Sequence, residues 1–390
     1  MNKGIKILMI VLQHSAKDDR IFYKEAISLK NNGYQVSYLL LTDKSGYIRD
    51  MSGKILNSNK ENVICIDGIK IIGFRPPTDM LNSLLKKVFL GSFQHDFVNA
   101  VLKENADIYH AHEPISLRFA FKASKISKKK VIFDSHETWI NGTAKEQLIK
   151  RFYLKRIKYL ITVNPAILKM LSKNLGIIYS EVIYNTSLTS LFPFRTATKK
   201  IDLPIQLVHE GSLSFDRGLK ILLNSILLLK TQFPNINLKI IGDSPKVEKN
   251  YISDFILKNN LQENINITGW INYEDVAGHL ANCDIGLILY TPSKNNLSST
   301  SNKLFNYIAA GLAIISADLP ETAKVLDPLN NAYILKAYNS RELANTIQRL
   351  IENPNLILKM KNASVQAYQK YNWEIEENKL LDFYQKVIDD

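Results

Sequence analysis

Cysteine and long apolar runs are scarce in this sequence. The two cysteines, Cys65 and Cys283, lie far apart and follow no metal-ligand spacing, which excludes a disulfide framework and a structural zinc module and fits a reducing cytoplasm. No 18 consecutive residues are all apolar, so we predict no membrane-spanning helix. The apolar run 5–12 is too short to cross a bilayer and no small-residue cleavage site follows it. We interpret it as a buried strand rather than a signal segment.

Negative charge is scarce in one half of the chain only. Residues 1–190 carry 29 lysines and arginines against 16 acidic residues, whereas residues 191–390 carry 21 of each. The net excess of +13 therefore belongs to the N-terminal half. This favours contact of that half with a membrane surface or nucleic acid, and a merely soluble basic surface is the alternative. We predict no nucleic-acid partner, because no aromatic-interleaved basic motif and no DNA-reading module appears.

Short apolar runs alternate with amphipathic stretches throughout the 390 residues. This alternation is typical of parallel sheets covered by helices on both faces, and the length predicts two such domains. We expect a first domain over residues 1–185, a linker over 186–204, a second domain over 205–371 and a last helix over 372–390. The fold class is α/β, with two Rossmann-like domains facing a central cleft. Ligands in such folds bind beyond the carboxyl ends of the strands.

The expected strands are short and apolar: 5–12, 36–41, 62–74 (a strand or hairpin), 108–112, 131–134, 160–163, 205–210, 238–241, 264–268, 285–289 and 313–316. The expected helices show amphipathic spacing: 20–31, 80–104, 116–127, 145–159, 165–175, 217–232, 247–259, 274–282, 302–310, 338–352, 354–371 and 373–387.

Two anion-binding candidates lie in the second half. Residues 298–311 place four hydroxyl residues and Lys303 at a predicted helix start, where free N–H groups bind phosphate without a metal ion. Plain N-capping by Ser301 is the alternative. Residues 209–218 contain Gly211, which lets a ligand approach the backbone. They also contain Arg217, which opposes the helix dipole unless an anion lies nearby or the residue is simply an exposed loop arginine. Together the two segments suggest one shared diphosphate site.

Histidine–glutamate pairs follow two strands of the first half, at residues 110–113 and 134–137. Two such pairs at equivalent strand ends favour a role in a cleft, although a lone histidine is more often structural. The spacing of a zinc site is missing, so we predict no metal. The loop 13–20, after the first strand, faces the same cleft. It has no glycine and is therefore no dinucleotide fingerprint.

Taken in order, these motifs resemble glycosyltransferase family four, which has the GT-B fold. The matching segments cover nearly the whole chain: 18–36, 109–113, 133–137, 164–165, 184–185, 211–218, 241–243, 268–270, 283–286 and 302–311. The resemblance implies retaining transfer of a sugar from a nucleotide diphosphate sugar. It also implies a C-terminal helix that crosses back onto the first domain.

The resemblance further implies roles for single residues. His136, beside the donor sugar, and Arg217 and Lys303, on the diphosphate, are the catalytic set. Contacts to the donor fall to Gly211, Ser212, Gly218, Trp270, Ile271, Ser301, Asn302, Leu304 and Asn306, with Trp270 and Ile271 at the base. Contacts near the acceptor or reacting phosphate fall to Asp18, Arg20, His112 and Glu113. The acceptor attacks from the front face, and the departing phosphate takes its proton.

The donor and acceptor classes also follow from the resemblance. It favours a UDP-sugar and transfer of a hexosyl or N-acetylhexosaminyl group to a glycan or lipid-linked acceptor, in cell-surface polysaccharide or glycoconjugate synthesis. No Asp-x-Asp occurs, so we expect a metal-independent enzyme without cofactors. Basic amphipathic stretches at 80–104 and 145–159 favour peripheral association with anionic lipid at the inner face of the cell membrane, and an ordinary solvated helix face is the alternative.

Three positions depart from the family pattern. Ser298 and Asn306 stand where two glutamates eight residues apart are usual, and the second of these normally holds the ribose hydroxyls. An amide at that position lacks charge assistance, which roughly halves the hydrogen-bond strength. Ser212 stands where a basic residue is usual, which leaves Arg217 alone on that side. These changes keep open an alternative, a catalytically inactive GT-B subunit that binds acceptor or a second transferase.

Overall fold

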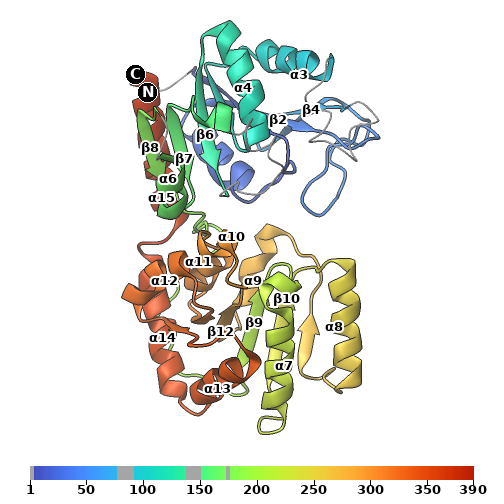
Figure 1. Cartoon of the computed structure of the whole chain (residues 1–390), viewed down its shortest axis with the longest axis vertical. Coiled ribbons are helices and arrows are strands. Elements are labelled where there is room, and N and C mark those ends of the chain that lie inside the picture. The colour runs from blue at the N-terminus through green and yellow to red at the C-terminus, as the bar shows by residue number, and fades with distance from the viewer. Residues whose placement is uncertain (1–3, 77–91, 138–150, 173–175) are drawn as a thin grey trace. The chain divides into compact units, whose positions relative to one another are not determined.

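The computed structural model describes residues 4–76, 92–137, 151–172 and 176–390 (Figure 1). The chain forms two compact units. The first comprises Met1–Tyr184 together with Glu376–Asp390, and the second comprises Asn185–Ile375. The boundary between the units lies immediately before the expected linker, whose residues belong to the second unit. In the described residues, no helix combines the length and apolarity that a membrane crossing requires.

The first unit is built on an eight-stranded sheet in the order β3-β4-β2-β1-β5-β6-β7-β8. All neighbouring strands are parallel except the β3–β4 hairpin. Its strands are β1 Lys6–Val11, β2 Gln35–Leu41, β3 Val63–Ile66, β4 Ile69–Phe74, β5 Ile108–Ala111, β6 Lys130–Ser135, β7 Tyr159–Thr162 and β8 Tyr179–Val182. The central strands are buried along nearly their whole length, as expected when helices cover both faces.

The helices of the first unit follow the strands in alternation. They are α1 Ile27–Asn31, α3 Ser92–Lys103, α4 Pro114–Ser127 and α6 Pro165–Ser172, and a π-helix, Ile21–Ala26, precedes α1. Much of the core lies between the sheet and α3 and α4, where Phe97, Phe119 and Phe133 are fully buried. Burial of these aromatic side chains contributes on the order of 2 kcal/mol each.

The last helix, α15 Trp373–Asp389, returns to the first unit, and Figure 1 draws it in red beside β7 and β8. Leu380, Phe383, Tyr384 and Val387 are buried at helical spacing, which gives this helix one apolar face. Lys130 of β6 donates from Nζ to the Val387 carbonyl at 2.7 Å, at the C-terminal end of the helix where a cation is favoured.

The second unit is an all-parallel six-stranded sheet in the order β11-β10-β9-β12-β13-β14. Its strands are β9 Gln206–Glu210, β10 Asn237–Ile241, β11 Ile265–Ile267, β12 Ile285–Ile288, β13 Ala313–Ser316 and β14 Ala332–Ile334. Its helices are α7 Leu219–Lys230, α8 Lys246–Lys258, α9 Val276–Leu280, α10 Lys294–Leu297, α11 Asn302–Ala309, α12 Pro320–Leu326, α13 Ser340–Ile351 and α14 Pro354–Tyr368.

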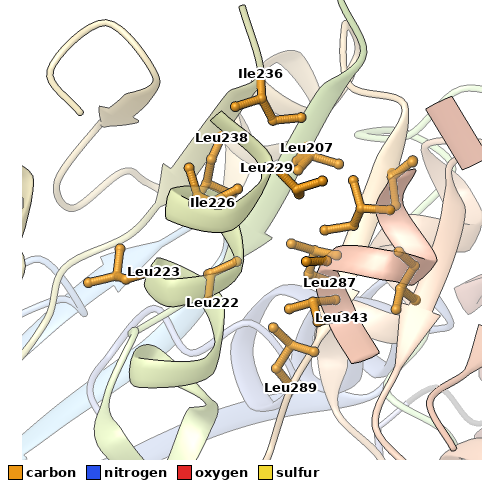
Figure 2. Close-up of a cluster of buried hydrophobic side chains, with 14 of the residues drawn as sticks. Leu207, Leu222, Leu223, Ile226, Leu229, Ile236, Leu238, Leu287, Leu289 and Leu343 are labelled. Carbon is orange, nitrogen blue, oxygen red and sulfur yellow. The ribbon is translucent and has the colours of Figure 1, made fainter. Parts of the chain in front are cut away.

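Leucine spacing explains how α7 packs on this sheet. Leu222, Ile226 and Leu229 recur at intervals of three or four residues, so they share one helix face. Figure 2 shows this face against Leu207 and Leu238 of the strands, and all of these residues belong to one buried cluster.

Most expected elements are present, with boundary shifts of a few residues. The expected helix 80–104 is described only as α3, because residues 77–91 lie outside the described part. Of the helix expected over 145–159, residues 145–150 lie outside the described part, 151–154 are helical and Tyr159 begins β7. The elements that were not expected include β8, β14, α10 and α12. The two strands are three or four residues long and only partly buried, so they lack a clear apolar run.

Strand order reverses at one place in each sheet. In the first unit β1 lies between β2 and β5, and in the second β9 lies between β10 and β12. Neighbouring connections leave such a point in opposite directions, which opens a crevice at the carboxyl ends of the strands. The segments that follow β1 and β9 are therefore the candidate ligand-binding segments.

Candidate functional site

Buried charged residues gather where β1, β5 and β6 end. Arg20 donates from Nε to Oδ2 of Asp134 at 2.9 Å and from Nη2 to Oδ1 at 3.2 Å. Its Nη1 donates to the Ile183 carbonyl at 3.0 Å, and its Nε also lies 2.9 Å from Oε1 of Glu25. Arg20 is 2% exposed, whereas Glu25 and Asp134 are fully buried. This arrangement ties the first loop to β6 and to the end of β8.

The π-helix sets the pairing of Arg20 with Glu25. The N–H of Glu25 donates to the Arg20 carbonyl at 2.9 Å, five residues back rather than four. Residues five apart face different sides of an α-helix, whereas the wider π turn places them nearly above one another. Asp18 starts this segment, since its Oδ1 accepts the N–H groups of Arg20 and Ile21 at 3.0 and 2.9 Å.

Protonation balances the charge of this cluster. Burial raises the pKa of Glu25 well above its usual value, and the nearby Asp134 charge adds to the effect. Burial also acts to raise the pKa of Asp134, but Arg20 and His136 outweigh it and hold that pKa well below its usual value. The raised pKa of Glu25 favours its neutral form beside the ionised Asp134, which limits the uncompensated charge around the Arg20 guanidinium.

The buried cluster also contains side chains of the types that bind metal ions. Candidate ligand atoms of Glu25, His110, His112 and Asp134 lie within 4.8 Å of one another. Yet the Arg20 guanidinium already contacts both carboxylates, and Tyr384 is bonded through its hydroxyl to Nδ1 of His110 at 2.8 Å. A divalent ion there faces repulsion from the guanidinium at close range. The donor set therefore fits an ion-paired structural cluster better than a metal site.

Two histidines form the accessible edge of the cluster. The side chains of His14 and His136 are 28% and 12% exposed, whereas that of Asp134 is fully buried. His136 is hydrogen-bonded through Nε2 to Oδ2 of Asp134 at 3.0 Å. Within the described residues, its Nδ1 is left available to a ligand. The rings of His14 and His136 meet edge to face, with centroids 5.3 Å apart.

His14 carries a positive charge at neutral pH. Burial lowers its pKa, but the 2.9 Å bond from Nδ1 to Asp18 and the charges of Asp18 and Glu113 outweigh burial and raise the pKa to about 9. Burial instead lowers the pKa of His112 to about 4, so that histidine is neutral. The accessible edge therefore presents an imidazolium suited to an anion or a polar acceptor group.

The residues predicted to contact the acceptor are buried. Asp18, Arg20, His112 and Glu113 are each less than 5% exposed. Glu113 accepts the N–H groups of Leu12 and Gln13 at 3.2 and 3.0 Å, and the N–H of His112 donates to Ser116 at 3.1 Å. In the structure these four residues position the loops around the histidines, and their contact with an acceptor stays a prediction. His14 was not predicted as a site residue, although its spacing of four from Asp18 was a usable signal.

Cations converge in the second unit, around the ring of Tyr290. The guanidinium carbon of Arg217 lies 5.6 Å and Nζ of Lys303 lies 5.0 Å from the ring centroid, within cation–π range. Nζ of Lys303 is 3.3 Å from Nε2 of His209, the residue before the end of β9. The Ser301 hydroxyl lies 3.4 Å from the Tyr290 hydroxyl. Sequence reasoning missed Tyr290, because a lone tyrosine after a strand carries no pattern.

Electrostatics around Tyr290 reflect these cations. Burial raises the pKa of Tyr290, but the charges of Lys303 and Arg217 outweigh it and lower the pKa below the usual value. Burial lowers the pKa of Lys303. Burial and the Lys303 charge together lower the pKa of His209 well below its usual value, so that imidazole is neutral and can accept from the ammonium. The charge of Glu210 acts in the opposite direction on Lys303. The two cations therefore lie against neutral groups, with one carboxylate in the vicinity.

Two glycines flank this site for different reasons. Gly211 and Gly218 both have φ of +83°, a region that favours glycine. A Cβ on Gly211 meets nothing within 4 Å, whereas a Cβ on Gly218 lies 2.3 Å from the Leu289 carbonyl oxygen. Gly211 therefore leaves space for a ligand, and Gly218 is explained by packing. Between them Arg217, which is partly exposed, donates from Nη1 to the Ser212 carbonyl at 3.3 Å.

The start of α11 lies within the same site. Ser301 is the N-cap residue, but its side chain makes no capping bond and lies near Tyr290 instead, so plain N-capping does not explain it. Asn302 is exposed at the first helical position. Leu304 is fully buried, and its N–H donates to the Ser301 carbonyl at 3.0 Å. Leu304 therefore presents neither this N–H nor an exposed apolar surface to a donor substrate.

The segment predicted to receive the base follows β11. Trp270 is 47% exposed, and Ile271 is partly exposed. The carbonyl of Gly269 accepts the N–H of Gly242 at 3.1 Å, which ties this loop to the end of β10. The exposed indole is an available stacking surface, and contact with a base stays a prediction.

Asn306 is engaged at both ends of its amide. The Ser187 hydroxyl donates to its Oδ1 at 2.6 Å, and its Nδ2 donates to Oε1 of Glu210 at 2.7 Å. Asn306 is 4% exposed. Ser298, the other departure, is the C-cap of α10 and donates to the Lys294 carbonyl at 3.3 Å.

Two family models match successive parts of the chain. Residues 23–186 match the model described as Glycosyltransferase Family 4, and residues 194–367 match the model described as Glycosyl transferases group 1. The two matches together identify the chain as a glycosyltransferase that resembles family four. The first match falls almost entirely within the first unit and the second falls within the second unit, and the resemblance predicted from the sequence is confirmed. A search of curated proteins finds no match to this sequence.

Solved structures show that this glycosyltransferase has the GT-B fold. Sucrose-phosphate synthase from Thermosynechococcus elongatus matches with a TM-score of 0.75 at 14% identity, over 98% of this chain and 99% of that one. HepE from Anabaena in complex with UDP matches with a TM-score of 0.74 at 15% identity, over 98% of this chain and 100% of that one. A glycosyltransferase from Rickettsia africae matches with a TM-score of 0.72 at 15% identity, over 100% of this chain and 99% of that one. The predicted fold class is confirmed, while identities this low show the fold alone.

Proposed function

We propose that this glycosyltransferase transfers a hexosyl or N-acetylhexosaminyl group from a UDP-sugar with retention of configuration. The observation that carries the proposal is the convergence of Arg217 and Lys303 on Tyr290 beside the open backbone of Gly211. Among the described residues, neither cation forms an ion pair with a carboxylate, so their charge is available to a diphosphate. The solved HepE structure in complex with UDP supports the choice of uridine.

The proposed chemistry needs no metal and no cofactor. As the bond to the sugar breaks, negative charge grows on the leaving diphosphate, and Arg217, Lys303 and the N-terminus of α11 stabilise it. The acceptor hydroxyl attacks from the face that the diphosphate leaves, and the departing phosphate oxygen takes its proton. Asp134 orients His136, which we assign to the donor sugar. Turnover that is unchanged in EDTA and a product with the donor's anomeric configuration by NMR are the expected results.

We assign the acceptor, a glycan or a lipid-linked sugar, to the first unit. The charge excess of residues 1–190 supports peripheral binding at the cytoplasmic face of an anionic membrane, in cell-surface polysaccharide or glycoconjugate synthesis. Liposome flotation tests the membrane part. Binding that rises with the anionic lipid fraction and weakens in salt is expected, and flotation that ignores lipid charge contradicts it.

Thermal unfolding with nucleotides tests the donor site. The wild type, Arg217→Ala and the exposed control Arg341→Ala are each unfolded with millimolar UDP, GDP, ADP or TDP. A ligand at 100 times its Kd stabilises by about 2.7 kcal/mol, a shift of a few degrees. We expect a shift with UDP that Arg217→Ala loses and Arg341→Ala keeps. No shift with any nucleotide favours the inactive-subunit alternative, which Asn306 and Ser298 motivate.

A further inference from the structure

Tyr290 follows β12 and lies beside the segment that carries Arg217. The residues next to the two side chains are in direct contact. The N–H and the hydroxyl of Thr291 both donate to the Asp216 carbonyl, at 2.8 and 2.7 Å. On the other side, Gly218 packs so closely that a Cβ there would lie 2.3 Å from the carbonyl oxygen of the residue before Tyr290. The backbone therefore fixes Arg217 beside the tyrosine.

A second cation reaches the same ring from the start of α11. Nζ of Lys303 lies 5.0 Å from the ring centroid of Tyr290, and the guanidinium carbon of Arg217 lies 5.6 Å from it. Both distances are within the range of about 6 Å for a cation–π interaction. The Tyr290 hydroxyl is 3.4 Å from the Ser301 hydroxyl, which is longer than the usual hydroxyl hydrogen bond of about 2.5–3.0 Å. The ring is therefore the part of Tyr290 that both cations share.

A neutral ring stabilises these cations without cancelling their charge. Burial lowers the pKa of Lys303 and the charge of Arg217 adds to this effect, whereas Tyr290 and Glu210 favour the ammonium form. A carboxylate in ion-pair contact would offset the loss of hydration but would also neutralise the cation. An aromatic ring attracts a cation through its quadrupole and carries no net charge. The positive charge next to Tyr290 therefore remains available to an anion.

Loss of the ring affects the protein before any ligand binds. Arginine and lysine side chains have many rotamers, and two like charges without a common partner move apart. A diphosphate then has to bring both cations together as it binds. Its apparent affinity falls in proportion to the fraction of molecules in which both are already in place.

We propose that Tyr290 is a positioning residue for the diphosphate of the donor, and that its ring holds Arg217 and Lys303 together before the donor binds. This inference rests on the proposed function and concerns how the same site is organised. Tyr290 acts through the two cations, and no contact of its own with the donor is required.

Calorimetric titration with UDP and with uridine, which has no phosphate, tests the inference. Both are titrated into the wild type, Tyr290→Phe, Tyr290→Leu and the control Tyr333→Leu. Tyr333 belongs to β14 in the same unit, and the guanidinium carbon of Arg349 lies 5.6 Å from its ring centroid. We expect Tyr290→Leu to weaken UDP binding by roughly 10-fold and uridine binding by less than about twofold. Tyr290→Phe keeps the ring, so it and the control stay within about threefold of the wild type.

Each other outcome contradicts a definite statement. Equal UDP affinities of wild type and Tyr290→Leu overturn the inference and leave the proposed function standing. Equal losses for UDP and uridine show that Tyr290 only supports the fold, which also overturns it. A Tyr290→Phe variant as weak as Tyr290→Leu assigns the effect to the hydroxyl and overturns the role of the ring. A wild type that binds neither ligand overturns the proposed function instead.

Fluorinated phenylalanines at position 290 test the ring even if Tyr290→Leu does not fold. Each added fluorine withdraws negative charge from the face of the ring, and the shape of the side chain changes little. We expect UDP affinity to fall stepwise from Tyr290→Phe through the mono-, di- and trifluorinated side chains, while uridine affinity stays constant. A series in which UDP affinity does not change contradicts the cation–π role.

Discussion

The two strand-end sites of this glycosyltransferase balance their charges differently. In the first unit Arg20 lies between Asp134 and Glu25, and His14 is paired with Asp18, so each cation has a carboxylate within 2.9 Å. In the second unit Arg217 and Lys303 lie against Tyr290, the Ser212 carbonyl and His209, which are all neutral groups. Charges that the protein itself neutralises serve the fold, whereas charges left on neutral supports are available to a ligand.

The largest expected effect concerns the neutralised cluster. Asp134→Asn keeps the shape but leaves Arg20 without its anion, and breaking a buried pair in this way costs about 3–5 kcal/mol. Urea unfolding of the first unit measures the loss. Asp107→Asn removes a half-exposed partner of Lys129 and serves as control, with an expected loss within about 1 kcal/mol. If the two variants are equally stable, the buried cluster is not structural.

Arg217→Ala tests a cation of the second unit, where the cations lie against neutral groups. We expect turnover to fall by about 100-fold, as for a lost charge stabiliser, while the unfolding midpoint without ligand stays close to that of the wild type. Steady-state kinetics and thermal unfolding measure the two effects, with Arg341→Ala as control. Near-normal turnover sinks the assignment of Arg217, and a large loss of stability shows that this cation serves the fold after all.

Gly211→Ala and Gly218→Ala form a matched pair, because both residues have φ of +83°. Each substitution costs roughly 1 kcal/mol for the left-handed conformation. Gly218→Ala adds a clash with the Leu289 carbonyl, so its total loss is at least about 2 kcal/mol. We expect Gly211→Ala to lose more nucleotide affinity than stability. If calorimetry shows the same affinity for that variant as for the wild type, the open space above Gly211 is not a ligand site.

The smallest effect is a pH dependence of the first unit. His14 has a folded pKa of about 9 against 6.5 for the free group, so its stabilisation is complete below about pH 6.5 and disappears as pH rises through 9. With partial exposure taken into account, we expect about 1–2 kcal/mol. Urea unfolding between pH 6 and 9.5 measures it. His14→Gln flattens the profile and the exposed control His95→Gln does not; identical profiles for all three proteins contradict the raised pKa.

The periodicity of apolar residues and the alternation of strand and helix patterns were sufficient to predict the architecture. Buried strands such as 108–111 and leucine-rich helices such as 219–230 carry strong apolar patterns. The ends of the strands then indicated His136, Arg217 and Lys303 as site residues, and their roles stay predictions. Sequence could not indicate that Arg20, His112 and Glu113 are buried, because burial depends on neighbours distant in the chain. Tyr290 was not predicted for the same reason, since its surroundings arise from side chains of other elements. The edge strands β8 and β14 are too short to produce a pattern.

The π-helix at Ile21–Ala26 has a consequence for how this protein tolerates insertions and deletions. Arg20 meets Glu25 because the turn holds one residue more than an α-helical turn. With α-helical winding, the present separation of five residues would turn Arg20 and Glu25 about 140° apart around the axis, whereas a separation of four residues would leave them within about 40°. Winding and residue count must therefore match in this segment. Loss of one residue is compatible with the pair only if the turn also becomes α-helical, whereas α-helical winding at the present length separates the guanidinium from Glu25.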